Sequence, residues 1–122
     1  MVVYKSASCG CCSSWVEHLR ANGFQVDAQN VSDARLLVIS REAGVTENLS
    51  SCHTAKIGGY VVEGHVPAAD IQRMLKERPP IAGLAAPGMP MGSPGMEQGG
   101  RKDPYNVVAF TKDGRQSVFA KH

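Results

Sequence analysis

Three of the four cysteines in this chain lie within four residues, in the segment Cys9-Gly10-Cys11-Cys12. The segment follows the strand-like run VVYK at residues 2–5 and precedes apolar residues at helical spacing, which predicts a turn from a strand into a helix. A disulfide within residues 9–12 would close almost no loop and would therefore stabilise the fold little. Because 122 residues can bury a core without such a bond, the clustering favours redox or metal chemistry.

The remaining pattern alternates strands and helices. It predicts strands at 2–5 and 24–28, helices that begin near Cys12 and Ser32, a two-stranded hairpin around Gly58-Gly59, and a third helix between Pro67 and Pro79-Pro80. This β-α-β-α-β-β-α order, with the cysteines between the first strand and the first helix, indicates an α/β protein with a thioredoxin-like core. We expect one such metal-binding domain over residues 1–122.

The segment 79–104 differs sharply in composition from the rest of the chain. It holds six of the seven prolines, six of the thirteen glycines and three of the five methionines. A flexible linker has this composition, but the segment keeps apolar residues and leads into a hairpin predicted over 105–120. We therefore expect a long Pro/Gly/Met-rich loop that is ordered and packs near the cysteines, at least around Met89.

The spacing of Cys9 and Cys12 is C-x-x-C. At a turn from strand to helix, this spacing places Cys9 near the N-cap and Cys12 in the first turn, where the helix end stabilises a thiolate. Cys11 adds a third thiol, and zinc ligand pairs prefer two to four intervening residues. Crowded thiolates suit Cu(I) better, because Cu(I) prefers soft sulfur donors. The alternative for Cys12 is a buried core thiol.

The fourth cysteine is Cys52, followed by His53, just before the predicted third strand. In thioredoxin-like folds the loop at this point faces the C-x-x-C turn and usually presents a cis proline. This chain has no proline between residues 1 and 66, so Cys52 is predicted to occupy that place and to bring all four sulfurs together. His53 is a candidate ligand or a partner of one, and a surface role is the alternative.

The other histidines and the loop methionines are weaker candidates. We expect His65 to fix the start of the third helix, and His18 and His122 to be solvated. Met89, Met91 and Met96 could offer thioether sulfur to copper, and Met89 is the candidate ligand among them.

Charge and hydropathy exclude several classes of partner. Thirteen basic and eleven acidic side chains leave a formal charge of +2, which does not indicate binding to nucleic acid or to an anionic membrane. No apolar run approaches the length of a membrane span. No signal-peptide pattern precedes the first predicted strand.

Three blocks of the chain, CGCCSSWVEHLRANGF, SCHTAKIGGYVVEGHVPAADI and GLAAPGMPMGSPGME, closely resemble one bacterial family. It is a family of thioredoxin-like metal-binding proteins of unknown function that includes the copper-resistance protein CopG. The resemblance implies an exported, periplasmic protein of copper handling, with copper-export or copper-carrier proteins as partners. It also implies that Cys9, Cys11, Cys12 and Cys52 bind copper, as Cu(I) or Cu(II), singly or as a multinuclear cluster.

Two functions remain open from the sequence. The first is a copper-binding resistance protein that holds Cu(I) and also changes its oxidation state. The second is a thiol–disulfide oxidoreductase in which Cys9 and Cys12 are the redox pair and the other two cysteines are accessory thiols. Neither the motifs nor the resemblance assigns an enzyme class.

Overall fold

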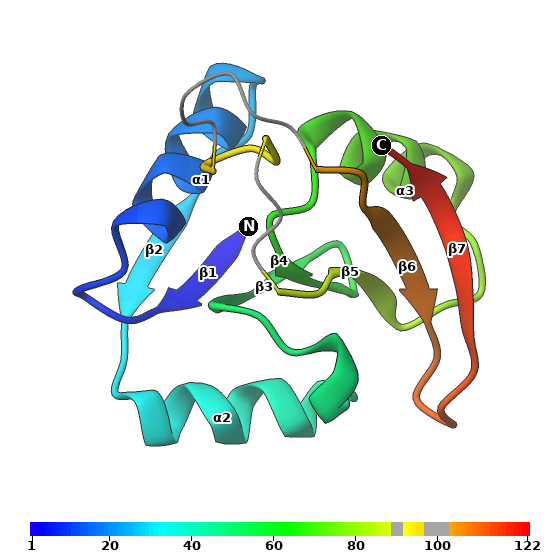
Figure 1. The fold of residues 1–122 in the computed structure, drawn as a ribbon, viewed down its shortest axis with the longest axis horizontal. Coiled ribbons are helices and arrows are strands. Elements are labelled where there is room, and N and C mark those ends of the chain that lie inside the picture. The colour runs from blue at the N-terminus through cyan, green and yellow to red at the C-terminus, as the bar shows by residue number, and fades with distance from the viewer. Residues whose placement is uncertain (89–91, 97–102) are drawn as a thin grey trace.

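A mixed β-sheet runs through the molecule (Figure 1). The computed structural model describes residues 1–88, 92–96 and 103–122, and over these residues the sheet has seven strands in the order β2-β1-β3-β4-β5-β6-β7. The strands are β1 (Val2–Lys5), β2 (Asp27–Asn30), β3 (His53–Ile57), β4 (Tyr60–Gly64), β5 (Gly83–Ala86), β6 (Asn106–Phe110) and β7 (Gln116–Lys121). The helices are α1 (Gly10–Ala21), α2 (Asp33–Glu42) and α3 (Ala68–Glu77), with a 3-10 turn η1 (Glu47–Leu49).

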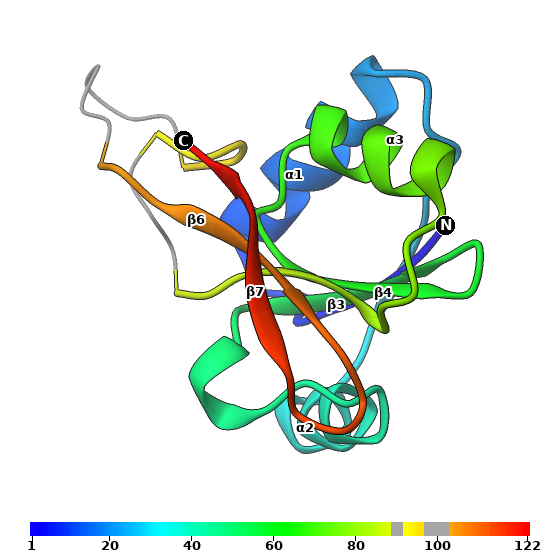
Figure 2. The same ribbon diagram turned by 90° about the vertical axis from the view of Figure 1, so that its right-hand side faces the viewer.

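Helices cover both faces of the sheet. Figure 2 shows α1 and α3 on one face and α2 on the other. The larger core cluster lies under α1 and α3 and includes Trp15, which is fully buried and donates from Nε1 to the Val66 carbonyl at 2.8 Å. A smaller cluster on the side of α2 includes Leu49 and Phe110. The first cluster anchors α1, and with it the cysteine turn, to the sheet.

The register of the central strands decides which end of the sheet carries the cysteines. β1 and β3 are antiparallel, and Lys5, the last residue of β1, is paired with His53, the first residue of β3. Residues that follow β1 and residues that precede β3 therefore lie at the same end. β4 is antiparallel to β3, so the chain returns to this end at Gly64.

The predicted α/β class and the order of elements through α3 are confirmed. The C-terminal hairpin is also confirmed, because β6 and β7 pair as antiparallel neighbours. The β2-β1-β3-β4 arrangement supports the thioredoxin-like interpretation, which remains an interpretation of the topology. The second strand begins later than predicted, at Asp27. Phe24 and Val26 pack against the core from the segment that leads into it, which gives that segment the apolar alternation of a strand.

The prediction that 79–104 is a loop throughout is wrong for residues 83–86. These residues form β5, which is parallel to β4 and antiparallel to β6, and all four are buried. The sequence GLAA lacks β-branched residues and is followed by a proline, which hides the strand in the pattern. A glycine is required at the first position of β5, because a Cβ at Gly83 would lie 1.9 Å from the Val61 carbonyl oxygen.

Candidate metal site

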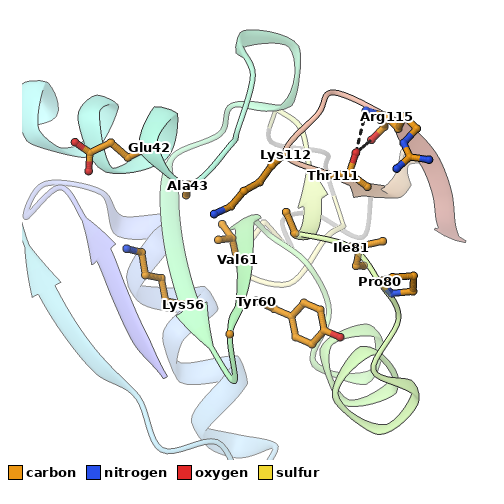
Figure 3. A pocket seen from close by; sticks show the side chains of 12 residues that line it. Glu42, Ala43, Lys56, Tyr60, Val61, Pro80, Ile81, Thr111, Lys112 and Arg115 are labelled. Atoms are coloured by element: carbon orange, nitrogen blue, oxygen red, sulfur yellow. Dashed lines mark hydrogen bonds between the residues drawn. The ribbon is translucent and has the colours of Figure 1, made fainter.

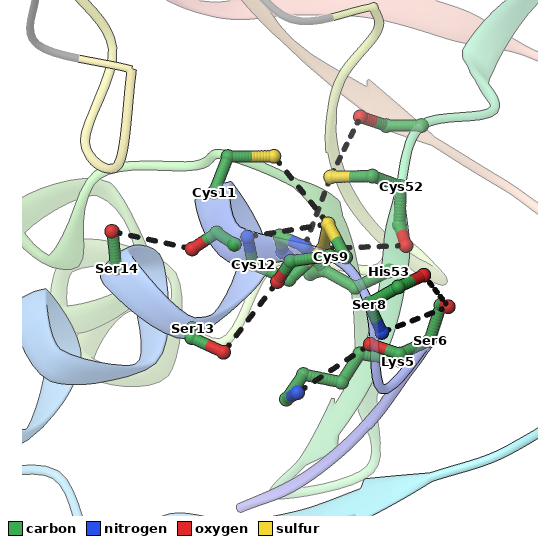
Figure 4. Close-up of a disulfide and its surroundings, with 12 residues drawn as sticks. Lys5, Ser6, Ser8, Cys9, Cys11, Cys12, Ser13, Ser14, Cys52 and His53 are labelled. Atoms are coloured by element: carbon green, nitrogen blue, oxygen red, sulfur yellow. Dashed lines mark hydrogen bonds between the residues drawn. A yellow bond between two sulfur atoms is a disulfide. The ribbon is translucent and has the colours of Figure 1, made fainter.

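The cysteine turn caps α1. Cys9 is the N-cap residue and its Sγ accepts from the Cys12 amide at 3.3 Å, as the C-x-x-C spacing predicts. Cys9 and Cys12 form a disulfide, and Cys11 Sγ lies 3.4 Å from Cys9 Sγ (Figure 4). Cys12 is fully buried on the apolar face of α1. The turn therefore holds three sulfur atoms in contact at the end of a helix.

Cys52 lies directly before β3 and completes a group of four sulfurs. Its carbonyl oxygen lies 3.5 Å from Cys12 Sγ, across the gap between α1 and β3. The Sγ atoms of Cys9, Cys11, Cys12 and Cys52 all lie within 4.8 Å of one another. The predicted convergence of Cys52 on the cysteine turn is confirmed, and it follows from the pairing of β1 with β3.

Two histidine rings also face the sulfur of Cys52. His53 Nδ1 lies 3.3 Å from Cys52 Sγ, and His65 Nε2 lies 3.1 Å from it. The second nitrogen of each ring contacts a backbone carbonyl, which can only accept: His53 Nε2 donates to Gly64 at 2.7 Å, and His65 Nδ1 donates to Pro94 at 2.6 Å. These contacts assign the tautomers, because each neutral ring then turns an unprotonated nitrogen toward Cys52.

The Cys52 thiol has fewer protons to donate than there are acceptor nitrogens around it. Cys52 has one S–H proton to donate, whereas two acceptor nitrogens face it, so the thiol can satisfy only one of them. A metal ion bound to the sulfur and to both nitrogens would satisfy all three. The backbone carbonyls that orient the two rings are the kind of partner that metal-bound histidines have. The residues Cys52, His53 and His65 thus form a second candidate ligand group that shares Cys52 with the first.

Burial sets the protonation states of these groups. Burial, followed by the charge on Cys11, raises the pKa of the Cys52 thiol to about 12. Burial, followed by the charge on His65, lowers the pKa of His53 to about 3, and burial also lowers the pKa of His65. At neutral pH the site therefore holds neutral imidazoles and a protonated Cys52, and an ion that binds Cys52 must displace its proton.

His65 is the site residue that the sequence analysis missed. Its ring does not fix the start of α3: that helix has Pro67 as its N-cap, and His18 Nε2 accepts from the Ala68 amide at 3.2 Å. The signal that could have found His65 is the Gly58-Gly59 hairpin, since a strand that pairs with β3 must end beside Cys52. His18 is half-buried rather than solvated, because its ring contacts the Ala68 amide at the start of α3.

The remaining predicted residues lie elsewhere or outside the described part of the chain. Met89 and Met91 fall outside the described residues, so the thioether ligand stays a prediction. Met96 is half-buried, and its backbone closes a turn with Gly92 at 2.8 Å. His122 is not simply solvated, because its Nε2 lies 2.6 Å from the Asp70 carboxylate, away from the cysteines.

An open pocket of about 550 Å³ lies away from the cysteines, among α2, the β4–β5 region and the β6–β7 hairpin (Figure 3). Its walls combine apolar residues such as Tyr60 and Ile81 with the cations Lys56, Lys112 and Arg115. Arg115 is already paired with Asp113 at 3.1 Å. The described residues that line this pocket include no cysteine or histidine, so it does not extend the sulfur site.

Fold and site together define a class of protein: a mixed α/β chain that gathers four sulfurs and two imidazoles at one end of its sheet. The sequence profile described as "Protein of unknown function, DUF411" matches residues 49–96. A solved structure described as "Copper resistance protein copG- Form 1" is 49% identical, with a TM-score of 0.91 over 99% of this chain and 94% of that chain. The Form 2 structure is 50% identical, with a TM-score of 0.91 over 99% and 95% of the two chains. No curated protein matches the chain.

The chain belongs to the family of the copper resistance protein CopG, and its residues 49–96 carry the DUF411 match. The predicted membership is therefore confirmed, and the likeness extends over nearly the whole chain. Among the described residues, no helix has the length and apolarity needed to cross a membrane.

Proposed function

We propose that this protein binds Cu(I) through Cys9, Cys11, Cys12 and Cys52 and serves copper resistance in the periplasm. The observation that carries the proposal is the convergence of the four sulfurs within 4.8 Å. Thiolates are the soft ligands that select Cu(I) among the common metals. The likeness to a copper resistance protein at 49% identity supports copper as the metal.

The ligand groups support a site for more than one ion. Two groups of ligands share Cys52: the four sulfurs, and the set of Cys52 with His53 and His65. A thiolate can bridge two Cu(I) ions, and imidazole also suits copper. Four thiolates carry four negative charges in a partly buried place, and each Cu(I) neutralises only one of them. We therefore assign the four cysteines as ligands of a small copper cluster, with the two histidines completing it.

The redox state of the Cys9–Cys12 pair determines how many thiolates are available to bind copper. In the disulfide form, two of the four sulfurs are no longer thiolates and cannot serve as anionic ligands. When the dithiol is oxidised by two Cu(II), the S–S bond forms, two thiol protons leave and two Cu(I) result. The same cysteines could in this way change the oxidation state of the copper that they bind. Copper-carrier or copper-export proteins would then be the partners that deliver or receive the ions.

A second candidate function is thiol–disulfide exchange. It is favoured by the disulfide at the N-cap of α1, where the helix end stabilises the thiolate that leaves on reduction. An external thiolate would attack one sulfur of the pair, form a mixed disulfide and release the other as a thiolate. Cys11, 3.4 Å from Cys9, would be the neighbouring thiol that resolves the mixed disulfide.

Metal analysis of protein purified without oxygen from copper-supplemented cells tests the proposal. We expect copper to co-purify at more than one ion per chain and to be retained against a weak chelator. A thiol-dependent insulin-reduction assay on the same sample tests the second candidate. Protein that reduces insulin efficiently but retains no copper would reverse the order of the two functions.

A further inference from the structure

Glu63 is a buried carboxylate beside the candidate ligands, and copper binding as proposed above does not use it. Its side chain is 2% exposed. Oε2 accepts from the Ser51 amide at 2.8 Å, and Oε1 accepts from the Thr54 hydroxyl at 2.5 Å. Ser51 and Thr54 directly flank Cys52 and His53. One side chain therefore holds both ends of the two-residue segment that carries two candidate ligands.

The next two residues contact the same segment. The Gly64 carbonyl accepts from His53 Nε2 at 2.7 Å, and His65 Nε2 lies 3.1 Å from Cys52 Sγ. Gly64 has a φ of +79°, and a Cβ there would lie 2.8 Å from Ser51 Cβ. Glu63, Gly64 and His65 thus approach the segment 51–54 closely, each through a different contact.

The segment needs this support because strand pairing ends before it. In the β3–β4 ladder the last pair is Thr54 with Glu63, so Ser51 and Cys52 lie beyond the hydrogen bonds of the sheet on this side. The Ser51 amide is partly buried and outside the ladder, so it needs another acceptor. The Ser51 amide finds the Glu63 carboxylate, and hydrogen bonds to a charged acceptor are stronger than those to a neutral one.

We propose that Glu63 is a positioning residue of the copper site. Acting through the Ser51 amide and the Thr54 hydroxyl, it holds the Cys52 thiol and the His53 ring where both meet His65. The inference rests on the proposed copper-binding function. The alternative is that Glu63 is a satisfied core carboxylate whose loss lowers stability without affecting the ligands.

Three substitutions separate these roles. Glu63→Met fills nearly the same space but accepts no hydrogen bond. Glu63→Gln keeps both bonds, because its amide oxygen can accept from Ser51 while its amide nitrogen donates to the Thr54 hydroxyl. Asp70→Ala is the matched control, since it removes another buried carboxylate, 7% exposed, that contacts His122 rather than the segment 51–54.

The measurement is Cu(I) affinity of the reduced full chain, by competition with a colorimetric chelator, together with nitrogen NMR shifts of the two imidazoles. We expect Glu63→Met to lower the affinity about 10–100-fold and to shift the His53 and His65 signals, as loss of a ligand's partner does. We expect Glu63→Gln and Asp70→Ala to match the wild type in both. Circular dichroism and Tm establish that each variant is folded.

Two results would overturn the positioning role: wild-type affinity in folded Glu63→Met, or an equal loss in Glu63→Gln and Glu63→Met. If Glu63→Met does not fold, Glu63→Asp replaces it, because the shorter side chain cannot reach both partners. Wild-type affinity in Glu63→Asp would likewise contradict the inference. A wild-type chain that binds no Cu(I) would instead contradict the proposed function.

Discussion

The sulfur of Cys52 lies 3.1 Å from Nε2 of His65, although thirteen positions separate the two residues in the chain. The contact arises because the β3–β4 hairpin brings the end of β4 back to the start of β3. It turns the four-cysteine group into a mixed sulfur and nitrogen site. Cys52 belongs to both halves of that site, so it should be the most sensitive of the four cysteines.

Serine at Cys52 is the first test of this view. We expect Cys52→Ser to lower both the number of Cu(I) bound and the affinity, the latter by more than about tenfold, because even the partners of a ligand affect affinity by about 10–100-fold. Titration of the reduced protein with Cu(I) in the presence of a competing chelator gives both values.

Cys11→Ser should lower the stoichiometry while leaving the Cys9–Cys12 disulfide able to form. Wild-type titrations of both variants would mean that the Cys9–Cys12 pair alone holds the metal.

Replacing His65 tests the nitrogen half of the site. We expect His65→Gln to weaken Cu(I) binding about tenfold, while His122→Gln, which alters a histidine away from the cysteines, leaves binding unchanged. The same competition titration measures both variants. Equal affinity for His65→Gln and wild type would restrict the site to sulfur.

Much of this arrangement could be predicted from the sequence, and the parts that could not have identifiable causes. The cysteine turn and Cys52 were predictable because local spacing and the element order determine where they lie. His65 was missed because its place beside Cys52 follows only when the register of the Gly58-Gly59 hairpin is worked out to the end of β4, and its role depends further on the tautomer set by the Pro94 carbonyl. β5 was hidden because its close approach to β4 requires glycine at position 83, and a run of glycine and alanine without β-branched residues resembles loop composition.

A glycine at position 64 is required by both backbone conformation and space. Its φ is +79°, and an added Cβ would lie 2.5 Å from the Ala86 carbonyl oxygen. We expect Gly64→Ala to lower the free energy of unfolding by about 2–4 kcal/mol, from left-handed strain plus overpacking. Gly59→Ala is the control, because φ is +87° there but, among the described residues beyond its two chain neighbours, no atom lies within 4 Å of the added Cβ. Its cost should be only the strain, about 1–2 kcal/mol, and urea unfolding measures both. Equal losses would rule out the close approach at Gly64.

Acidification should destabilise the metal-free protein through His53. Burial, followed by the charge on His65, holds the pKa of His53 at about 3, so between pH 6.5 and 3 the unfolded chain binds a proton that the folded chain does not. The stability from this residue is therefore present above pH 6.5 and is lost as the pH falls, by about 4–5 kcal/mol in total. Glu63 opposes part of the loss, because burial raises its pKa to about 6 and the folded chain then holds its proton more tightly.

The check is urea unfolding of wild type and His53→Gln between pH 7 and pH 4. We expect the stability of wild type to fall more steeply than that of His53→Gln. Parallel curves would mean that His53 takes up its proton in the folded state as readily as in the unfolded one.

The most direct test of the copper site is the stoichiometry and proton balance of Cu(I) binding to the fully reduced wild-type chain. Burial raises the pKa of the Cys52 thiol to about 12, so a copper-bound Cys52 must release its proton at neutral pH. We expect more than one Cu(I) per chain, bound cooperatively, with protons released as the ions bind. We expect Cys52→Ser to bind fewer Cu(I) ions and to release fewer protons. A single Cu(I) per chain, with equal proton release from wild type and Cys52→Ser, would contradict a site in which four sulfurs and two imidazoles act together.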